Sequence, residues 1–261
     1  MTAAYPRLTG RRVVVTGGGS GIGAATAARV AAEGAAVTVL DALGDTAETV
    51  AADIRAAGGT ATGLRCDVGD ERAVGDAVTR AAREMDGIDG LVCSAGITRP
   101  ARTHELTLAD WETVIRVNLT GAFLPIRDCL PHLVAAGASA IVTIGSVASI
   151  VSAGRTPAYD ASKAGLLQLT RSVAVEYVDD GVRANCLCPG AVATSLVSNT
   201  RALHGADNSD RVAGASARIR PPMERVADPS EIATVVAFLL STESSFMTAA
   251  AVAVDGGYTA I

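Results

Sequence analysis

A glycine-rich turn between a short apolar run and a helical segment is the feature that most constrains how this chain folds. Residues 12–16 are mostly β-branched, and residues 17–23 read G-G-G-S-G-I-G. An alanine-rich segment with helical spacing follows as far as Ala32. Glycines at a helix start leave backbone N–H groups unobstructed, so these groups can bind a pyrophosphate at the positive end of the helix dipole. The sequence therefore predicts a strand, an anion-binding turn and a helix.

Strand-like and helix-like segments continue to alternate along the chain. We expect further strands at residues 36–40, 60–65, 88–93, 140–144, 182–188 and 249–254. Helices are expected at residues 46–57, 71–85, 108–136, 157–178 and 231–240. Units of this length predict an α/β fold, a doubly wound parallel sheet with helices on both faces. No repeat or linker divides the 261 residues, which indicates a single domain spanning residues 1–261.

Two segments are expected to depart from regular helix. Pro125 and Pro131 lie inside the helix predicted at residues 108–136 and should bend or divide it. Residues 191–223 are polar and rich in glycine and alanine, and they have no steady periodicity. A segment of this length inside a compact domain is usually functional or mobile, so we interpret it as a lid over the site.

Charge and hydropathy limit the partners of the chain. The net charge is −5 and the pI is near 5.2, which argues against a general affinity for nucleic acid or an anionic membrane surface. The first twelve residues lack the apolar core of a signal peptide, and no later stretch approaches an uncharged membrane span. We therefore expect a cytoplasmic protein with small soluble partners.

The five cysteines indicate buried free thiols in a reducing compartment. They are odd in number, and they lie within or beside apolar segments, at Cys66, Cys93, Cys129, Cys186 and Cys188. Cys186 and Cys188 are expected on opposite faces of an extended strand, which argues against a shared metal ion. The three histidines, His104, His132 and His204, have none of the usual ligand spacings, so no metal site is predicted.

A tyrosine and a lysine four residues apart are the strongest chemical signal. Tyr159 and Lys163 follow Pro157 in a segment with helical spacing, so both side chains lie on one helix face. A lysine ammonium there favours the phenolate and lowers the tyrosine pKa, as a general acid or base requires. Ser146, thirteen residues upstream, is in reach of the same substrate oxygen. Asn118, a polar residue in an apolar helix, is either structural or part of the site.

Asp41 lies where a ribose-binding carboxylate is expected. It ends the second predicted strand, twenty residues after Gly21. No cation is visible nearby in the sequence, because the glycine turn contains neither lysine nor arginine and residues 42–44 are Ala-Leu-Gly. Such a carboxylate would accept hydrogen bonds from ribose hydroxyls and repel a phosphate on the same ribose.

These motifs together resemble the classical short-chain dehydrogenase/reductase family, over nearly the whole chain from Arg11 to Gly257. The resemblance rests on motifs that occur in the family's order. They are T-G-G-G-S-G-I-G at 16–23, D-V at 67–68, S-A-G at 94–96, Asn118, Ser146, Y-D-A-S-K at 159–163, N-C-L-C-P-G at 185–190 followed by V-A-T, and V-D-G-G at 254–257.

The resemblance implies a seven-stranded Rossmann-type sheet and hydride transfer between a nicotinamide and an alcohol or carbonyl. It implies that Tyr159 is the acid/base, that Ser146 orients the substrate oxygen, that Lys163 lowers the tyrosine pKa and holds the nicotinamide ribose, and that Asn118 anchors a water in the proton relay. Asp41 favours NAD(H) over NADP(H). The implied cofactor contacts are Gly17, Gly19, Ser20, Gly21, Ile22, Asp41, Asp67, Val68, Ser94, Ala95, Gly96, Tyr159, Lys163, Pro189, Gly190, Val192 and Thr194.

Two positions depart from the commoner family pattern. Cys93 and Ser94 stand where two asparagines are frequent, so their strand-stabilising hydrogen bonds must come from Ser94 or elsewhere. Gly145 replaces the serine often found before the catalytic serine. We expect both to alter local rigidity more than the type of reaction.

The leading hypothesis is an NAD(H)-dependent oxidoreductase that interconverts a secondary alcohol and a ketone. One alternative is a 3-oxoacyl thioester reductase, against which the negative charge and Asp41 speak weakly. A second is a non-catalytic binding protein on the same fold, against which the intact tetrad speaks. The resemblance also implies a homotetramer, and we expect Leu166, Leu167, Leu169 and Val173 to give one of its helices an apolar face for a partner subunit.

Overall fold

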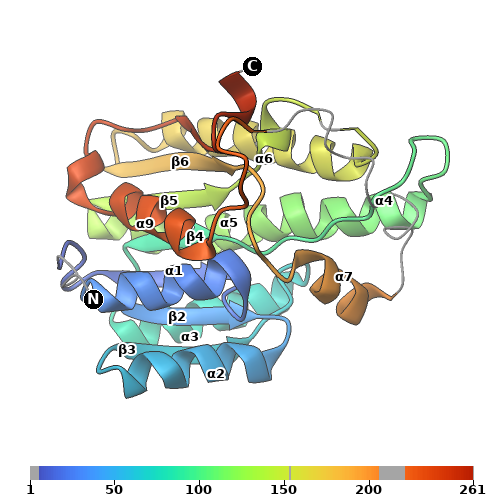
Figure 1. Ribbon diagram of the computed structural model, residues 1–261. Coiled ribbons are helices and arrows are strands. Elements are labelled where there is room, and N and C mark those ends of the chain that lie inside the picture. The colour runs from blue at the N-terminus through green and yellow to red at the C-terminus, as the bar shows by residue number, and fades with distance from the viewer. Residues whose placement is uncertain (1–5, 153, 206–220, 261) are drawn as a thin grey trace.

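Seven parallel strands form one sheet in the order β3-β2-β1-β4-β5-β6-β7 (Figure 1). The computed structural model describes residues 6–152, 154–205 and 221–260. The strands are β1 Arg12–Thr16, β2 Ala36–Asp41, β3 Thr60–Arg65, β4 Gly90–Cys93, β5 Ser139–Ile144, β6 Val182–Pro189 and β7 Ala251–Val254. The prediction of a parallel α/β sheet with seven strands is confirmed, and the bounds differ by at most two residues at each end.

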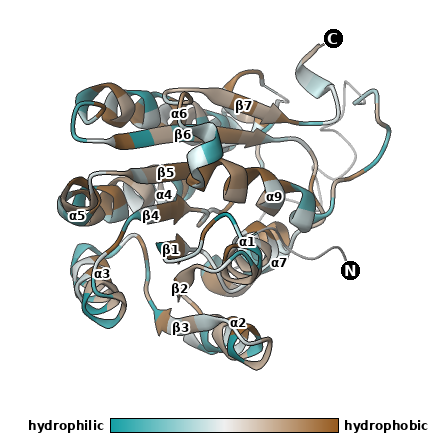
Figure 2. Cartoon of the chain, turned by 90° about the vertical axis from the view of Figure 1, so that its left-hand side faces the viewer, coloured by the Kyte–Doolittle hydropathy of each residue, from teal (hydrophilic) through white to brown (hydrophobic). Residues whose placement is uncertain are grey.

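The strands read as unbroken apolar runs because both faces of the sheet are buried. In β1, Val14 packs into the core on one face, while Val13 and Val15 pack into the core on the other. Figure 2 shows this as hydrophobic strands between two layers of helices. An alternating pattern, which marks a half-exposed sheet, is absent from β1 for this reason.

Helices on opposite faces supply these two cores. The first face is covered by α1 Gly21–Ala32, α2 Gly44–Ala56 and α9 Pro229–Leu240. The second is covered by α3 Glu71–Met85, α5 Gly121–Ala136 and α6 Pro157–Glu176. Figure 2 shows α1, α2 and α9 on one side of the sheet and α3 and α5 on the other. None of the helices in the described part of the chain is long and apolar enough to cross a membrane.

The long helix predicted at residues 108–136 is interrupted, but not at its prolines. Helix α4 Leu108–Ile115 passes into a π-helical segment, Arg116–Thr120, and then into α5. Both prolines lie within α5, where Pro125 is buried and Pro131 is exposed. Of the predicted bend or division, a division at the prolines is wrong, since α5 continues through both of them. The interruption falls instead at Asn118, and such wide turns often occur at functional sites.

Part of the segment predicted as a lid is helical. Helix α7 Leu196–His204 lies within residues 191–223, where we expected no regular structure. An isolated parallel bridge between Val192 and Ala227 ties the beginning of this segment to the chain that follows it. Residues 206–220 lie outside the described part of the chain. The expectation of an irregular segment is therefore corrected for α7.

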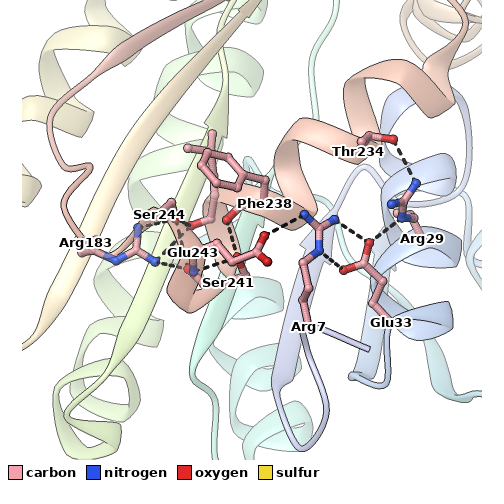
Figure 3. Close-up of polar contacts among 10 residues, drawn as sticks. Arg7, Arg29, Glu33, Arg183, Thr234, Phe238, Ser241, Glu243 and Ser244 are labelled. Carbon is pink, nitrogen blue, oxygen red and sulfur yellow. Dashed lines mark hydrogen bonds and ion pairs between the residues drawn. The ribbon is translucent and has the colours of Figure 1, made fainter. Parts of the chain in front are cut away.

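A buried carboxylate links the N-terminal segment to α1 and to the end of α9 (Figure 3). Glu33 is fully buried and accepts hydrogen bonds from Arg7, at 2.7 and 2.8 Å, and from Arg29 at 2.5 Å. Burial alone raises the pKa of Glu33, but the hydrogen bonds from the two arginines outweigh it, so the pKa is lowered. Arg7 also contacts Glu243 at 3.3 Å. This Glu33 cluster lies at the amino-terminal edge of the sheet.

The five thiols are all buried, as predicted. The expectation that Cys186 and Cys188 face opposite ways is wrong, since their sulfur atoms lie 4.0 Å apart. A strand alternates with a period of two, so residues two apart share one face. Among the described residues, no group of three or more potential ligands is placed to hold a metal ion.

Candidate active site

A cavity of about 740 Å³ opens at the carboxyl edge of the sheet. The loops after β1, β2, β3, β4, β5 and β6 all contribute to its wall, as expected for ligand sites in open α/β sheets. It brings together nearly all of the predicted site residues. Those lining it are Gly17, Ser20, Gly21, Ile22, Asp41, Asp67, Val68, Ser94, Ala95, Gly96, Ser146, Tyr159, Lys163, Pro189, Gly190, Val192 and Thr194.

The glycine turn leaves room for a ligand backbone against α1. Gly17 has φ +62° and Gly21 φ +52°, both in the left-handed region that favours glycine. A Cβ atom at Gly19 would lie 2.2 Å from Thr46 Oγ1, so no other residue fits there without movement. No side chain caps the first turn of α1. This arrangement fits the pyrophosphate of a dinucleotide, because unobstructed N–H groups face the cavity.

Asp41 is held in place by the backbone on both sides. Its Oδ2 accepts a hydrogen bond from the Gly19 N–H at 2.9 Å, and its Oδ1 accepts one from the Leu43 N–H at 3.0 Å. Gly19 does not line the cavity itself but orients this carboxylate. Each carboxylate oxygen has a further lone pair, so Asp41 can still accept from ribose hydroxyls. The position fits the ribose of a dinucleotide, as the sequence predicts.

Arg65 corrects the expectation that no cation lies near Asp41. It ends β3, and it is the register partner of Asp41 at the end of β2. Both residues line the cavity. The sequence does not reveal this neighbour because Arg65 follows Asp41 by 24 positions, and only the pairing of two parallel strands brings them together.

Ser146 and Tyr159 place two hydroxyl groups at one point of the cavity. Ser146 begins the short 3-10 helix Val147–Ser149, and its Oγ accepts from the Ala148 N–H at 3.1 Å. The Ser146 and Tyr159 side chains both line the cavity. Burial raises the pKa of Tyr159, and the neighbouring Ser146 opposes that rise without cancelling it. The prediction that the Tyr159 pKa is lowered is therefore wrong for the chain by itself, where this pKa is raised.

Lys163 is buried on the same helix face as Tyr159. Its Nζ donates to the Ile144 carbonyl at 2.7 Å and lies 5.6 Å from the centroid of the Tyr159 ring. Burial lowers the pKa of Lys163 to about 8, although the nearby thiols of Cys186 and Cys188 act in the opposite direction. With a pKa of about 8, Lys163 still carries its charge at neutral pH.

Asn118 lies behind the cavity wall and does not line it. Its Oδ1 accepts from the Ile97 N–H at 2.8 Å, and its Nδ2 donates to the Ile97 carbonyl and to Ser162 Oγ, each at 3.0 Å. The side-chain amide thus holds the loop after β4 against α6. Its direct hydrogen bonds are structural, and the water-anchoring role stays a prediction.

The loop after β4 is fixed by a residue from β1. The buried Thr16 hydroxyl accepts from the backbone N–H groups of Ser94 at 3.2 Å and Ala95 at 3.5 Å. Thr16, not the Ser94 side chain, thus supplies hydrogen bonds that compensate for the missing asparagine amides. A Cβ atom at Gly96 would lie 3.5 Å from Lys163 Nζ. This glycine leaves the lysine open to the cavity.

Helix α7 forms part of the cavity wall, and its helical form was not predicted from the sequence. Asn199 Nδ2 donates to Ser20 Oγ in the glycine turn at 2.8 Å, and the Thr98 N–H donates to Thr200 Oγ1 at 3.3 Å. Arg99 donates to the carbonyls of His204 and Gly205 at the end of α7. The helix is thus attached both to the glycine turn and to the loop after β4. The apolar residues of α7 do not repeat at helical spacing, so the sequence offers no signal for these contacts.

The comparisons with known proteins agree with this geometry. A family model described as enoyl-(acyl carrier protein) reductase matches residues 17–259. Cis-4-hydroxycyclohexanecarboxylate dehydrogenase of Sinomonas cyclohexanicum is 43% identical over 252 residues, covering 96% of this chain and 97% of that protein. 2-(S)-hydroxypropyl-CoM dehydrogenase 3 of Xanthobacter autotrophicus is 38% identical, with 98% of this chain and 99% of that protein covered.

A solved structure agrees as well. A short-chain type dehydrogenase/reductase from Mycobacterium marinum superimposes with a TM-score of 0.88 at 30% identity, covering 98% of each chain. The strand order, the glycine turn and the serine, tyrosine and lysine at one edge of the sheet are explained together by these matches. The chain belongs to the classical short-chain dehydrogenase/reductase family.

Proposed function

We propose that the protein is an NAD(H)-dependent oxidoreductase that interconverts a secondary alcohol and a ketone. The observation that carries this proposal is that Ser146, Tyr159 and Lys163 line one cavity together with the glycine turn. The names of the two relatives describe dehydrogenases of hydroxylated compounds, which supports the same reaction class.

In the proposed reaction, Tyr159 accepts the hydroxyl proton of the alcohol while the carbinol carbon loses a hydride. Bound NAD⁺ would supply the hydride acceptor. The Ser146 hydroxyl donates to the same substrate oxygen and keeps it in reach of the phenol. The Lys163 ammonium, buried beside the tyrosine ring, favours the negative charge that develops on the phenol oxygen. Ketone reduction follows the same steps in reverse, with Tyr159 as the proton donor.

The preference for NAD(H) is proposed from Asp41. A second phosphate on the adenosine ribose would lie close to this carboxylate, and the two like charges repel. Gly17, Gly21 and the first turn of α1 would hold the pyrophosphate, and Asp67 and Val68 line the cavity beyond Asp41. NAD(H) is thus expected to be the better of the two cofactors.

The function is tested with a panel of cyclic and acyclic secondary alcohols and ketones, scored by the absorbance of reduced nicotinamide with both cofactors. We expect turnover of at least one alcohol or ketone, with a higher kcat/KM for NAD(H). Acetoacetyl-CoA in the same panel tests the thioester alternative. A protein that binds nicotinamide dinucleotide but turns over none of these substrates would contradict the proposed reaction.

We also propose a homotetramer, but not through the residues predicted for it. Leu166, Leu167 and Val173 are buried in the chain's own core and Leu169 is partly buried, so they are not free to contact a partner. The exposed apolar side chains on this face include Phe123 of α5 and Val175 of α6, which are 44% and 71% exposed. At micromolar concentration, light scattering is expected to give about four times the 26.2 kDa of one chain. A monomer would overturn this proposal.

We propose that residues 191–223 cover bound substrate, with α7 as the described part of this lid. We also propose a cytoplasmic location, on the grounds of composition given above.

A further inference from the structure

Arg65 and Asp41 carry opposite charges at two neighbouring strand ends. They are register partners in parallel β2 and β3, whose backbones lie about 4.8 Å apart. Val39 and Ala61, two and four residues before them, are buried in the core on the α1 and α2 side of the sheet. Because side chains alternate along a strand, Asp41 and Arg65 point to this same side. Both line the cavity that we assign to the dinucleotide.

The two side chains differ in how much of their hydrogen-bonding capacity is already in use. Asp41 accepts from the backbone N–H groups of Gly19 and Leu43. Arg65 is exposed, and its guanidinium makes no hydrogen bond or ion pair with any residue in ranges 6–152, 154–205 and 221–260. Its five N–H donors are therefore available to an anionic ligand.

The stem of Arg65 is fixed even though its guanidinium is unpaired. Helix α2 begins at Gly44, and a Cβ atom at this glycine would lie 2.9 Å from Arg65 Cβ. The absence of a side chain at Gly44 allows the arginine to lie against the first turn of α2. The positive end of the α2 dipole thus lies beside the Arg65 stem, and it favours an anion near the same strand end.

We propose that Arg65 is a specificity-determining residue whose guanidinium binds the 2′-phosphate of NADP(H), so that the protein accepts NADP(H) as a second cofactor. This inference rests on the proposed function, because it needs the cavity to bind a nicotinamide dinucleotide. Asp41 repels the 2′-phosphate and Arg65 attracts it, so the pair reduces the discrimination that Asp41 alone would give. NAD(H) stays the better cofactor, since Asp41 also accepts from the unmodified ribose hydroxyls.

The test measures binding of two probes by calorimetry: adenosine 5′-monophosphate and adenosine 2′,5′-bisphosphate. Arg65→Ala is expected to weaken binding of the bisphosphate about tenfold, the scale of one charge-assisted contact, and to change binding of the monophosphate less than about twofold. Arg65→Gln, which keeps most of the stem, should behave like Arg65→Ala. Arg55→Ala is the control, because it removes an exposed arginine of α2 that pairs with Glu48 and does not line the cavity.

The kinetic counterpart is the ratio of kcat/KM with NADP(H) to that with NAD(H), which should fall about tenfold in Arg65→Ala and stay unchanged in Arg55→Ala. If the monophosphate binds and the bisphosphate is unaffected by both Arg65 variants, the role of Arg65 is overturned while the dinucleotide site stands. If the wild-type protein binds neither probe, the dinucleotide site, and with it the proposed function, is overturned as well.

Discussion

Tyr159→Phe is expected to lower turnover by about two to four orders of magnitude while leaving cofactor binding unchanged. The substitution removes only the phenol hydroxyl, the group that exchanges a proton with substrate in the proposed reaction. The aromatic ring, which contacts the core beside Val68 and Ile97, stays in place. The measurements are kcat on the best substrate of the panel and the dissociation constant of NADH.

Tyr177→Phe provides a matched control for this experiment. Tyr177 is the C-cap residue of α6. Tyr177→Phe removes the same kind of group, a phenol hydroxyl, at the end of the helix far from the cavity. We expect this variant to keep its activity. Retention of most turnover by Tyr159→Phe would mean that another group exchanges the proton. A loss of NADH binding would point to a structural defect instead.

Glu33→Gln is expected to destabilise the protein by about 3 kcal/mol, the lower end of the range for breaking a buried ion pair. The amide keeps one acceptor oxygen, but its NH2 group replaces the oxygen that accepts from Arg7 Nε, and the two guanidinium groups lose their shared counter-ion. The lower end applies because these arginines are 13% and 35% exposed, so water replaces part of the lost interaction. The measurement is the free energy of unfolding in urea at one protein concentration.

Glu84→Gln is the control, because Glu84 pairs with Arg80 at 2.7 Å in the same i,i+4 spacing but on an exposed surface. Its loss should cost less than about 1 kcal/mol. Both variants are expected to retain wild-type kcat, since neither residue lines the cavity. Equal destabilisation by the two substitutions would show that burial of Glu33 has no special energetic effect.

The Glu33 cluster also sets a pH dependence. Because the pKa of Glu33 is lowered in the folded chain, its stabilisation is complete above the unfolded value near 4.5 and is lost as pH falls through the folded value. The difference in stability between the wild-type protein and Glu33→Gln should therefore narrow in acid and be constant at neutral pH. A difference that grows on acidification would contradict the assignment.

The fold was predictable because its signals are local. Each strand has its own run of apolar residues, and the glycine turn has residues that allow a positive φ. The sequence pattern therefore located the strands within two residues at each end. The π-helical segment at Asn118 was not predictable in this way. It is favoured by hydrogen bonds from one side chain to Ile97 and Ser162, which are distant in the chain.

The site was predictable where a motif fixes the residues, and less so where tertiary pairing does. Ser146, Tyr159 and Lys163 belong to recognisable motifs, and the structure brings them to one cavity. Arg65 belongs to none, and it reaches the cavity only through the register of β2 and β3. Helix α7 was missed for a related reason: its Leu203 and Asn199 face the cavity instead of the core, so no apolar periodicity marks it.

The complete burial of the five thiols places internal chemical probes at β3, β4, α5 and β6. A thiol reagent can reach Cys129 only when α5 separates from the sheet, and it can reach Cys186 only when β6 is uncovered. When reclosing is faster than labelling, the rate of labelling reports the free energy of each opening. The free energies of opening at α5 and at β6 can therefore be compared by thiol labelling, without introducing any new residue.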